Sequence, residues 1–89
     1  MILEFDKSFD KSLDKIKDRV LLSRIENAIL KAEKAGTIEN IPNTKKLTGF
    51  SKYYRIKIGD YRLGFERINR ETIRLIIVEH RKDIYRKFP

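Results

Sequence analysis

The stretch YRIKIGDYRLGF, residues 54–65, constrains the fold of this chain more than any other segment. Apolar and polar residues alternate on both sides of Gly59-Asp60, and a period of two is typical of a half-buried strand. A glycine-first pair between two such runs predicts a type II′ turn. The segment therefore predicts a β-hairpin within residues 53–68, with Gly59 and Asp60 at its tip.

This turn decides which residues lie opposite each other in the predicted hairpin. Lys57 pairs with Arg62, and Arg55 pairs with Gly64, which leaves room on that face for something to approach. The opposite face carries Tyr54, Ile56, Ile58, Tyr61, Leu63 and Phe65, which suit packing on helices. Like charges directly opposite each other destabilise a sheet, so the Lys57 and Arg62 pair predicts an anion site, above all for a phosphate. A solvated face whose long cations splay apart is the alternative.

The N-terminal half predicts a short strand and two helices. Residues 1–6 alternate imperfectly, and Asp6 is placed to cap the first helix. The boundary with the second helix is expected near Asp18, and Gly36 is expected to be the C-cap of that helix. Residues 36–50 hold two of the four glycines and one of the two prolines, which predicts a connection.

The C-terminal half completes one α+β domain that spans residues 1–89. After a polar turn, the run TIRLIIVEH (72–80) has apolar residues at both odd and even positions, which predicts a strand covered on both faces. The expected order is βααβββ, with an optional helix in the basic tail. It predicts a mostly antiparallel, four-stranded sheet with the helix pair packed on one face.

Charge and composition narrow the class of partner. The chain has 21 Lys and Arg against 13 Asp and Glu, which gives a net charge of +8. A domain as basic as this usually binds a polyanion or an acidic protein. Solubility alone is the simpler explanation of this charge. The absence of cysteine excludes disulfides and thiolate metal sites. No apolar run approaches the roughly 20 residues that span a bilayer, and MILE is no signal peptide, so a cytoplasmic protein is expected.

Three segments together resemble a known family. KKLTGF (45–50), YRIKIGDYRLGF (54–65) and VEHRKDIYRKF (78–88) are similar to the RelE/ParE superfamily of bacterial toxins, and in particular to its ribosome-dependent mRNA endonucleases. The resemblance covers essentially the whole chain and implies a RelE-like fold. It also implies the toxin of a type II toxin–antitoxin system, with a cognate antitoxin (RelB-like or other) and the ribosome with its mRNA as partners.

The same resemblance implies catalytic roles for four residues. In the nuclease branch, a 2′-hydroxyl in the ribosomal A site attacks the adjacent phosphate. Arg62 and Lys57 resemble the cations that hold this phosphate, and Arg81 resembles the arginine assigned to charge stabilisation or leaving-group protonation. Tyr85 resembles the tyrosine proposed as general base. Since side chains would supply all the charge, the resemblance implies no metal and no other cofactor.

Four further residues are expected to bind substrate: Arg55, Lys45, Lys46 and His80. The two lysines are solvated unless their loop lies beside a phosphate. His80 is either a second acid or base or a packed neighbour of Arg81, so Tyr85 and His80 both stay candidates for the general base. Two other functions stay open. One is a ParE-like toxin that inhibits DNA gyrase, and the other is a non-catalytic module that binds RNA or the ribosome.

Overall fold

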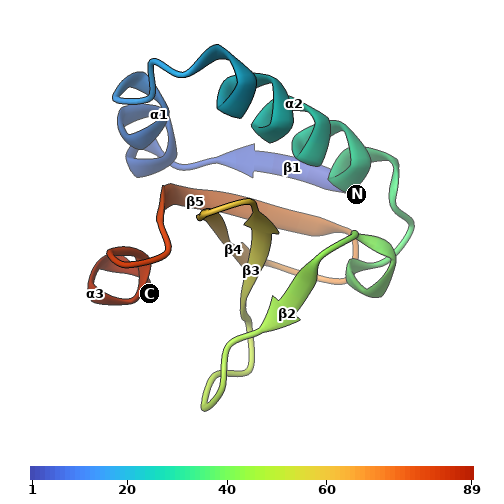
Figure 1. The fold of residues 1–89 in the computed structure, drawn as a ribbon. Coiled ribbons are helices and arrows are strands. Elements are labelled where there is room, and N and C mark those ends of the chain that lie inside the picture. Colours follow the sequence, from blue (N-terminus) through green and yellow to red (C-terminus); the bar gives the residue numbers. More distant parts are fainter.

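The computed structural model describes residues 1–89 as two helices lying over one face of a five-stranded sheet (Figure 1). Along the chain the elements are β1 (Ile2–Phe5), α1 (Lys7–Asp14), α2 (Arg19–Lys34), the 3-10 helix η1 (Ile38–Asn40), β2 (Thr44–Lys46), β3 (Tyr53–Ile58), β4 (Tyr61–Arg67), β5 (Thr72–His80) and α3 (Ile84–Lys87). The strands are ordered β1-β5-β4-β3-β2, and only β1 and β5 run parallel. The predicted α+β class is confirmed.

The fifth strand, β2, was not predicted. It lies within residues 36–50, where a connection was expected, and its three residues are too few to show a periodic pattern. It becomes a strand by pairing with β3, with Lys45 opposite Arg55 and Lys46 opposite Tyr54. Because this pairing joins segments about ten residues apart, the local sequence contains no signal for it.

The starts of both helices follow the prediction. The Asp6 carboxylate accepts a hydrogen bond from the backbone N–H of Ser8 (3.1 Å), and Asp18 Oδ1 accepts from Val20 and Leu21 (2.9 and 3.2 Å). The Ser8 hydroxyl and N–H favour the charged carboxylate and hold the pKa of Asp6 below its usual value. The predicted Asp6 cap is confirmed, and Asp18, expected near the boundary between the helices, is the N-cap of α2.

The end of α2 lies within two residues of the predicted Gly36, but the predicted cap was wrong. The helix stops at Lys34, and Ala35 leaves it in an extended conformation with φ −69° and ψ 138°. The backbone N–H of Ala35 donates to Lys31 and Ala32 carbonyls, so the last turn closes without a left-handed residue. Gly36 is therefore not a C-cap.

The hairpin has the predicted register. Ile58 lies opposite Tyr61, Lys57 opposite Arg62, and Arg55 opposite Gly64. Gly59 has a φ of 59°, and Asp60 has no positive φ, as a type II′ turn requires. The two faces of β3 and β4 therefore carry the residues that the alternation assigned to them.

The larger core lies between the helices and the helix-covered face of the sheet. Ile56, Leu63 and Phe65 are at most 2% exposed there, and they pack with Phe9 of α1 and Ile25 of α2. A smaller core on the other face contains Ile77, Ile84 and Phe88. The central strand β5 is thus covered on both sides, as its continuous apolar run predicts.

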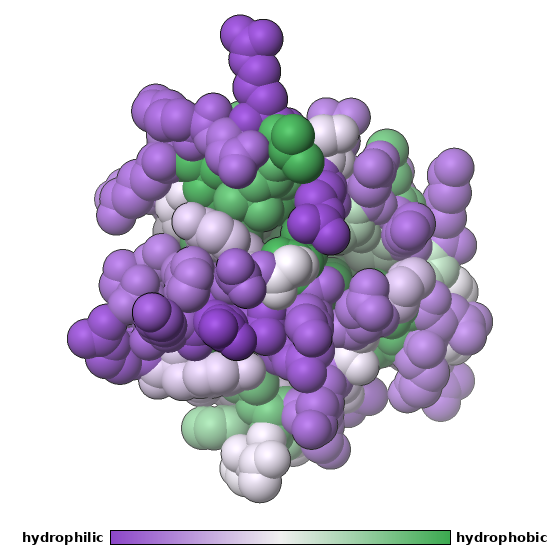
Figure 2. All heavy atoms as spheres, in the orientation of Figure 1, coloured by the Kyte–Doolittle hydropathy of each residue, from purple (hydrophilic) through white to green (hydrophobic).

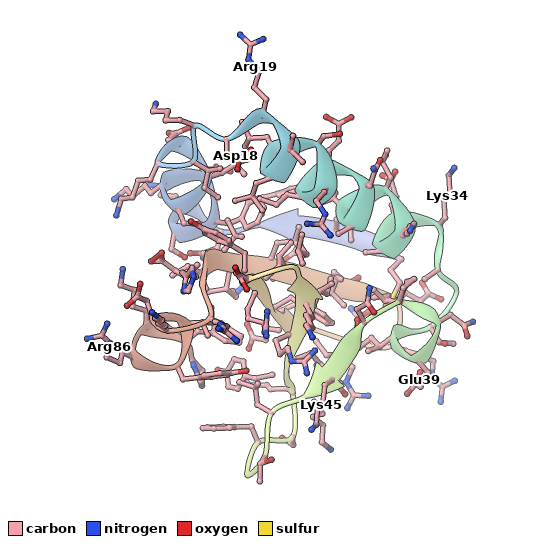
Figure 3. The ribbon with its side chains drawn as sticks, in the orientation of Figure 1. Asp18, Arg19, Lys34, Glu39, Lys45 and Arg86 are labelled. Atoms are coloured by element: carbon pink, nitrogen blue, oxygen red, sulfur yellow. The ribbon has the colours of Figure 1, made fainter.

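The exterior is dominated by charge. In Figure 2, hydrophilic side chains cover most of the visible face, with smaller apolar areas between them. Figure 3 shows Arg19 and Lys34 projecting from α2 away from the sheet, whereas Lys45 projects from β2. No helix combines the length and the hydrophobicity that crossing a membrane requires.

Candidate functional site

The open face of the sheet, which the helices leave uncovered, carries two pairs of like charges. On β3, Arg55 lies opposite Lys45 of β2, and Lys57 lies opposite Arg62 of β4. Cβ atoms of such partners are about 4.5–5.5 Å apart, so each pair costs the fold some stability. None of these four residues takes part in an ion pair. Their charge is therefore available to an anion.

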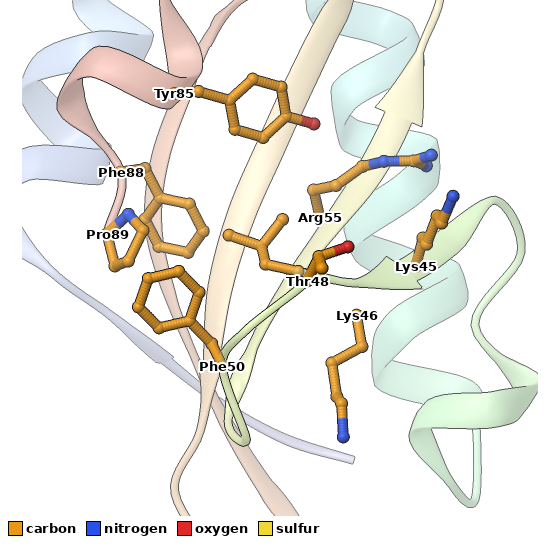
Figure 4. Close-up of a pocket in the computed structure, with 9 residues that line it drawn as sticks. Lys45, Lys46, Thr48, Phe50, Arg55, Tyr85, Phe88 and Pro89 are labelled. Carbon is orange, nitrogen blue, oxygen red and sulfur yellow. The ribbon is translucent and has the colours of Figure 1, made fainter.

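A pocket of about 620 Å³ opens beside the first of these pairs (Figure 4). It is lined by residues of β2, of the following loop, of β3 and of the C-terminal segment: Lys45, Lys46, Leu47, Thr48, Phe50, Arg55, Tyr85, Phe88 and Pro89. The lining includes three cations and a phenol but no Asp or Glu side chain. The side chains that line the pocket therefore carry a net positive charge, which favours an anionic ligand.

Tyr85 and Arg55 face each other across this pocket. The Tyr85 hydroxyl points toward the side of the pocket that holds Arg55 and Lys45, and the tyrosine is 58% exposed. One guanidinium nitrogen of Arg55 donates to the Asn43 carbonyl oxygen at 3.0 Å, which limits the movement of the side chain. Its other N–H groups are free to bind a ligand in the pocket.

The position of Tyr85 depends on the packing of α3. Ile84 is fully buried and Phe88 is 2% exposed, and both pack with Ile77 of β5. A Cβ at position 64 would lie 2.7 Å from two atoms of the Phe88 ring, so only glycine allows this contact. The room predicted above Gly64 is thus filled by the chain's own Phe88. This packing directs Tyr85 to the pocket side of the helix.

A second group of cations lies at the hairpin turn. Arg62 Nη1 donates to the carbonyl oxygens of Gly59 and Tyr61 at 2.8 and 2.9 Å. Arg81 Nε lies 3.9 Å from Asp60 Oδ1, and its backbone N–H donates to the Asp60 carbonyl at 2.8 Å. Both guanidinium groups therefore lie near the turn, outside the lining of the Tyr85 pocket.

The two remaining predicted residues lie elsewhere. Lys57 is exposed and lines a separate open hollow with Arg24 and Lys31 of α2. His80 packs edge-on against Tyr61, with ring centroids 5.4 Å apart, and its Nδ1 accepts from the Lys82 N–H at 3.1 Å. Because Tyr61 belongs to the helix-covered face, His80 lies away from the open-face cations.

The structure thus brings Tyr85, Arg55, Lys45 and Lys46 together in one pocket and leaves Lys57, Arg62, Arg81 and His80 outside it. The sequence interpretation gave no role to Phe50, which also lines the pocket. An aromatic residue close to two lysines in a loop is a signal that could have indicated it. No group of three or more His, Cys, Asp or Glu residues is arranged to hold a metal ion.

Comparison with known proteins decides the family. A family model described as the ParE toxin of the type II toxin–antitoxin system parDE matches residues 3–85. This chain belongs to the RelE/ParE superfamily of type II toxins. Toxin RelE3 of Methanocaldococcus jannaschii is 39% identical over 67 residues, which cover 74% of this chain and 75% of that protein. The predicted superfamily is confirmed.

Solved structures show the same fold. In the RelB–RelE antitoxin–toxin complex from Methanococcus jannaschii, the matching chain is 35% identical, with a TM-score of 0.78 over 97% of this chain and 99% of that chain. The chain matched in the intact E. coli RelBE complex is 24% identical, with a TM-score of 0.69 over 89% and 94% of the two chains. The second likeness concerns the fold alone.

Proposed function

We propose that this toxin is an endoribonuclease that cleaves mRNA in the ribosomal A site and so stops translation in the cytoplasm. The observation that carries the proposal is the exposed Tyr85 phenol, which faces Arg55 across a pocket lined by cations. A phenol can exchange a proton with a ribose hydroxyl, and the cations can hold a phosphate. The RelE name of the 39% identical relative supports the same activity.

The proposed reaction is a transesterification within the RNA. Tyr85, in its phenolate form, takes the proton of a 2′-hydroxyl, whose oxygen bonds to the adjacent phosphorus. The bond from phosphorus to the 5′ oxygen of the next nucleotide breaks, and that oxygen takes up a proton. The products are a 2′,3′-cyclic phosphate and a 5′-hydroxyl. Arg55 and Lys45 line the pocket where the non-bridging oxygens would lie.

The cations at the turn complete this proposal. Lys57 and Arg62 extend the positive face along the strands, and Arg81 stabilises the developing charge or protonates the leaving oxygen. Arg81 is 58% exposed and Asp60 is 72% exposed, and such ion pairs are weak, so a bound phosphate can displace the contact. We expect His80 to support this end of the site through its packing on Tyr61. Since side chains supply the charge, the toxin should need no metal ion of its own.

The test is cell-free translation with the 5′ ends of the message mapped by primer extension. Wild type should cleave within translated codons and leave 2′,3′-cyclic phosphate ends. Tyr85→Phe and Arg81→Ala should each reduce the cleavage rate by about 100-fold or more, the usual contribution of an acid or base. Lys34→Ala, which changes a cation that projects away from the sheet, is the matched control (Figure 3). If wild type and Arg81→Ala leave the message equally intact, the proposal fails.

A ParE-like inhibitor of DNA gyrase is the second candidate, because the matching family model carries the ParE name. Such a toxin would need neither a phenolic base nor a phosphate site. Double-strand breaks in an assay with gyrase and plasmid DNA, with the message untouched, would favour it. A non-catalytic RNA-binding module would instead show salt-dependent binding that Tyr85→Phe leaves unchanged, with no cleavage by wild type.

We further propose that a cognate antitoxin, RelB-like or of another kind, covers the open face. The two relatives of known structure described above were solved as RelB–RelE complexes, and the net charge of +8 favours an acidic partner segment. In the complex, Lys45 and Lys57 should be protected from acetylation, while Lys34 should stay reactive. Equal acetylation of all three with and without the antitoxin would argue against coverage of this face.

A further inference from the structure

The Tyr85 pocket has two chemically different halves. Arg55 and Lys45 form a cationic half, which the Tyr85 hydroxyl faces, whereas the Lys46 side chain also lines the pocket but points away from that hydroxyl. The other half is apolar and is lined by Leu47, Phe50, Phe88 and Pro89. The cations can bind a phosphate, but phosphate binding does not explain why the other half of the pocket is apolar. We propose that the apolar half binds a nucleobase of the RNA, which stacks on the ring of Phe50. This inference rests on the proposed function.

Phe50 is built as a rigid platform rather than as part of the core. It is 45% exposed, although burial of a phenylalanine is normally favourable. Its backbone is held in a turn, because its N–H donates to the Leu47 carbonyl at 3.2 Å and Gly49 before it has a φ of 85°. The ring is thus presented to the pocket from a loop of defined shape (Figure 4).

A row of aromatic rings supports this platform. Phe50 packs edge-on against Tyr53, with centroids 5.6 Å apart at an angle of 78°. Tyr53 packs in the same way on Phe88, with centroids 5.6 Å apart at 83°, and Phe88 is buried against Gly64. Edge-to-face pairs hold rings in a preferred geometry. The row therefore anchors Phe50 to the sheet, so that a ligand need not order the ring when it binds.

The two halves together indicate a nucleotide rather than a lipid or a purely apolar peptide. A nucleotide combines a planar base with an anionic phosphate, and bases in single-stranded RNA are commonly held by stacking on aromatic side chains. The volume of about 620 Å³ lies within the range of about 300–1,000 Å³ that is typical of small-molecule sites. Stacking accepts any base, so we expect Phe50 to contribute affinity without dictating a sequence.

The test uses the whole toxin and a short RNA that carries a single 2-aminopurine and 2′-O-methyl riboses, which block cleavage. Stacking quenches 2-aminopurine fluorescence. Wild type should quench the probe, and Phe50→Ala should abolish the quenching and weaken binding by about 5- to 150-fold. Phe50→Trp should keep both. Phe50→Leu should bind without full quenching, which separates stacking from simple burial. Lys34→Ala is the control for general charge.

The outcomes distinguish this inference from the proposed function. Quenching by Phe50→Ala equal to that of wild type, or no quenching by wild type, overturns the base site, whether or not the message is cleaved in translation. Quenching that depends on Phe50, without cleavage by wild type, supports the base site and refutes the nuclease. A Phe50→Ala variant that loses antitoxin binding but still quenches the probe would assign the platform to a protein partner and overturn the inference.

Discussion

The two faces of the β3–β4 hairpin differ in what they contribute. On the helix-covered face, Ile56, Leu63 and Phe65 are at most 2% exposed and form the centre of the core. On the open face, Arg55 and Lys57 flank Ile56 along β3, and both lie opposite another cation. Burial of apolar side chains on the first face stabilises the fold, whereas like-charge repulsion on the second face destabilises it. Buried apolar residues and exposed cations are thus separated by the alternation of side chains along each strand.

The open face is itself divided into two parts. The Lys45 and Arg55 pair lies at the pocket that holds Tyr85, whereas Arg62 of the other pair is hydrogen-bonded to the hairpin turn. The register places both pairs on one face but does not determine where their charged ends lie. We therefore expect Lys45 and Arg55 to bind the reacting phosphate, and Arg62 and Arg81 to move toward it from the hairpin turn.

The largest expected effect on stability is at the centre of the helix-covered face. Leu63→Ala should lower the free energy of unfolding by about 2–5 kcal/mol, because it leaves a cavity at a fully buried position. Urea unfolding followed by circular dichroism measures the change. Arg55→Gln, on the opposite face of the sheet, should change this free energy by less than about 1 kcal/mol while reducing cleavage. Equal losses of stability in the two variants would contradict the division between the faces.

Gly64→Ala tests the contact between the open face and the C-terminal tail. The added Cβ meets the Phe88 ring at 2.7 Å, so the variant should lose about 1–3 kcal/mol of unfolding free energy and loosen α3. Proteolysis near residues 84–88 should become faster.

The same contact can be isolated with a double-mutant cycle. In a Phe88→Ala background, the ring is absent and Gly64→Ala should cost little, which gives a coupling of about 0.5–3 kcal/mol between the two sites. Additive effects of the two substitutions would show that the ring and the glycine do not share this space.

Neutralising one cation of a pair should change stability and binding in opposite directions. Lys45→Gln or Lys57→Gln should raise the free energy of unfolding by a few tenths of a kcal/mol, because each removes a like-charge contact. Each should also lower the slope of log affinity for single-stranded RNA against log salt by about 0.7. Lys34→Gln should leave the salt slope unchanged. A loss of stability on neutralisation would contradict the repulsion.

The smallest expected effect concerns the cap of α1. The folded state lowers the pKa of Asp6 from 3.8, chiefly through the Ser8 hydroxyl and then through its N–H. Because the carboxylate is the favoured form, its contribution is present above pH 3.8 and is lost as pH falls through the lower pKa of the folded protein. At pH 7 the melting temperature of wild type should therefore be higher than that of Asp6→Asn. The difference between the two melting temperatures should disappear in acid. A difference that is constant with pH would contradict this assignment.

Much of the fold could be predicted because its signals are local. Gly59 identifies the turn, alternation assigns Leu63 and Lys57 to opposite faces, and aspartates mark both helix starts. The α2 terminus escaped prediction because a buried Ala35 ends the helix in place of the expected glycine. Of the candidate site, the cation pair on β3 and β4 followed from the register, while the partners of Tyr85 did not.

The covalent order of residues is sufficient to sort side chains onto faces, since a strand turns each successive residue to the other side whatever surrounds it. A pocket needs surfaces that are distant in the chain. Here Lys45 reaches Arg55 through strand pairing, and Tyr85 reaches both because Phe88 docks on Gly64. These contacts form only when β2, β3 and α3 pack together. No single segment of the sequence therefore predicts them. The sequence was therefore sufficient to predict the cationic face, whereas the pocket depends on the tertiary structure.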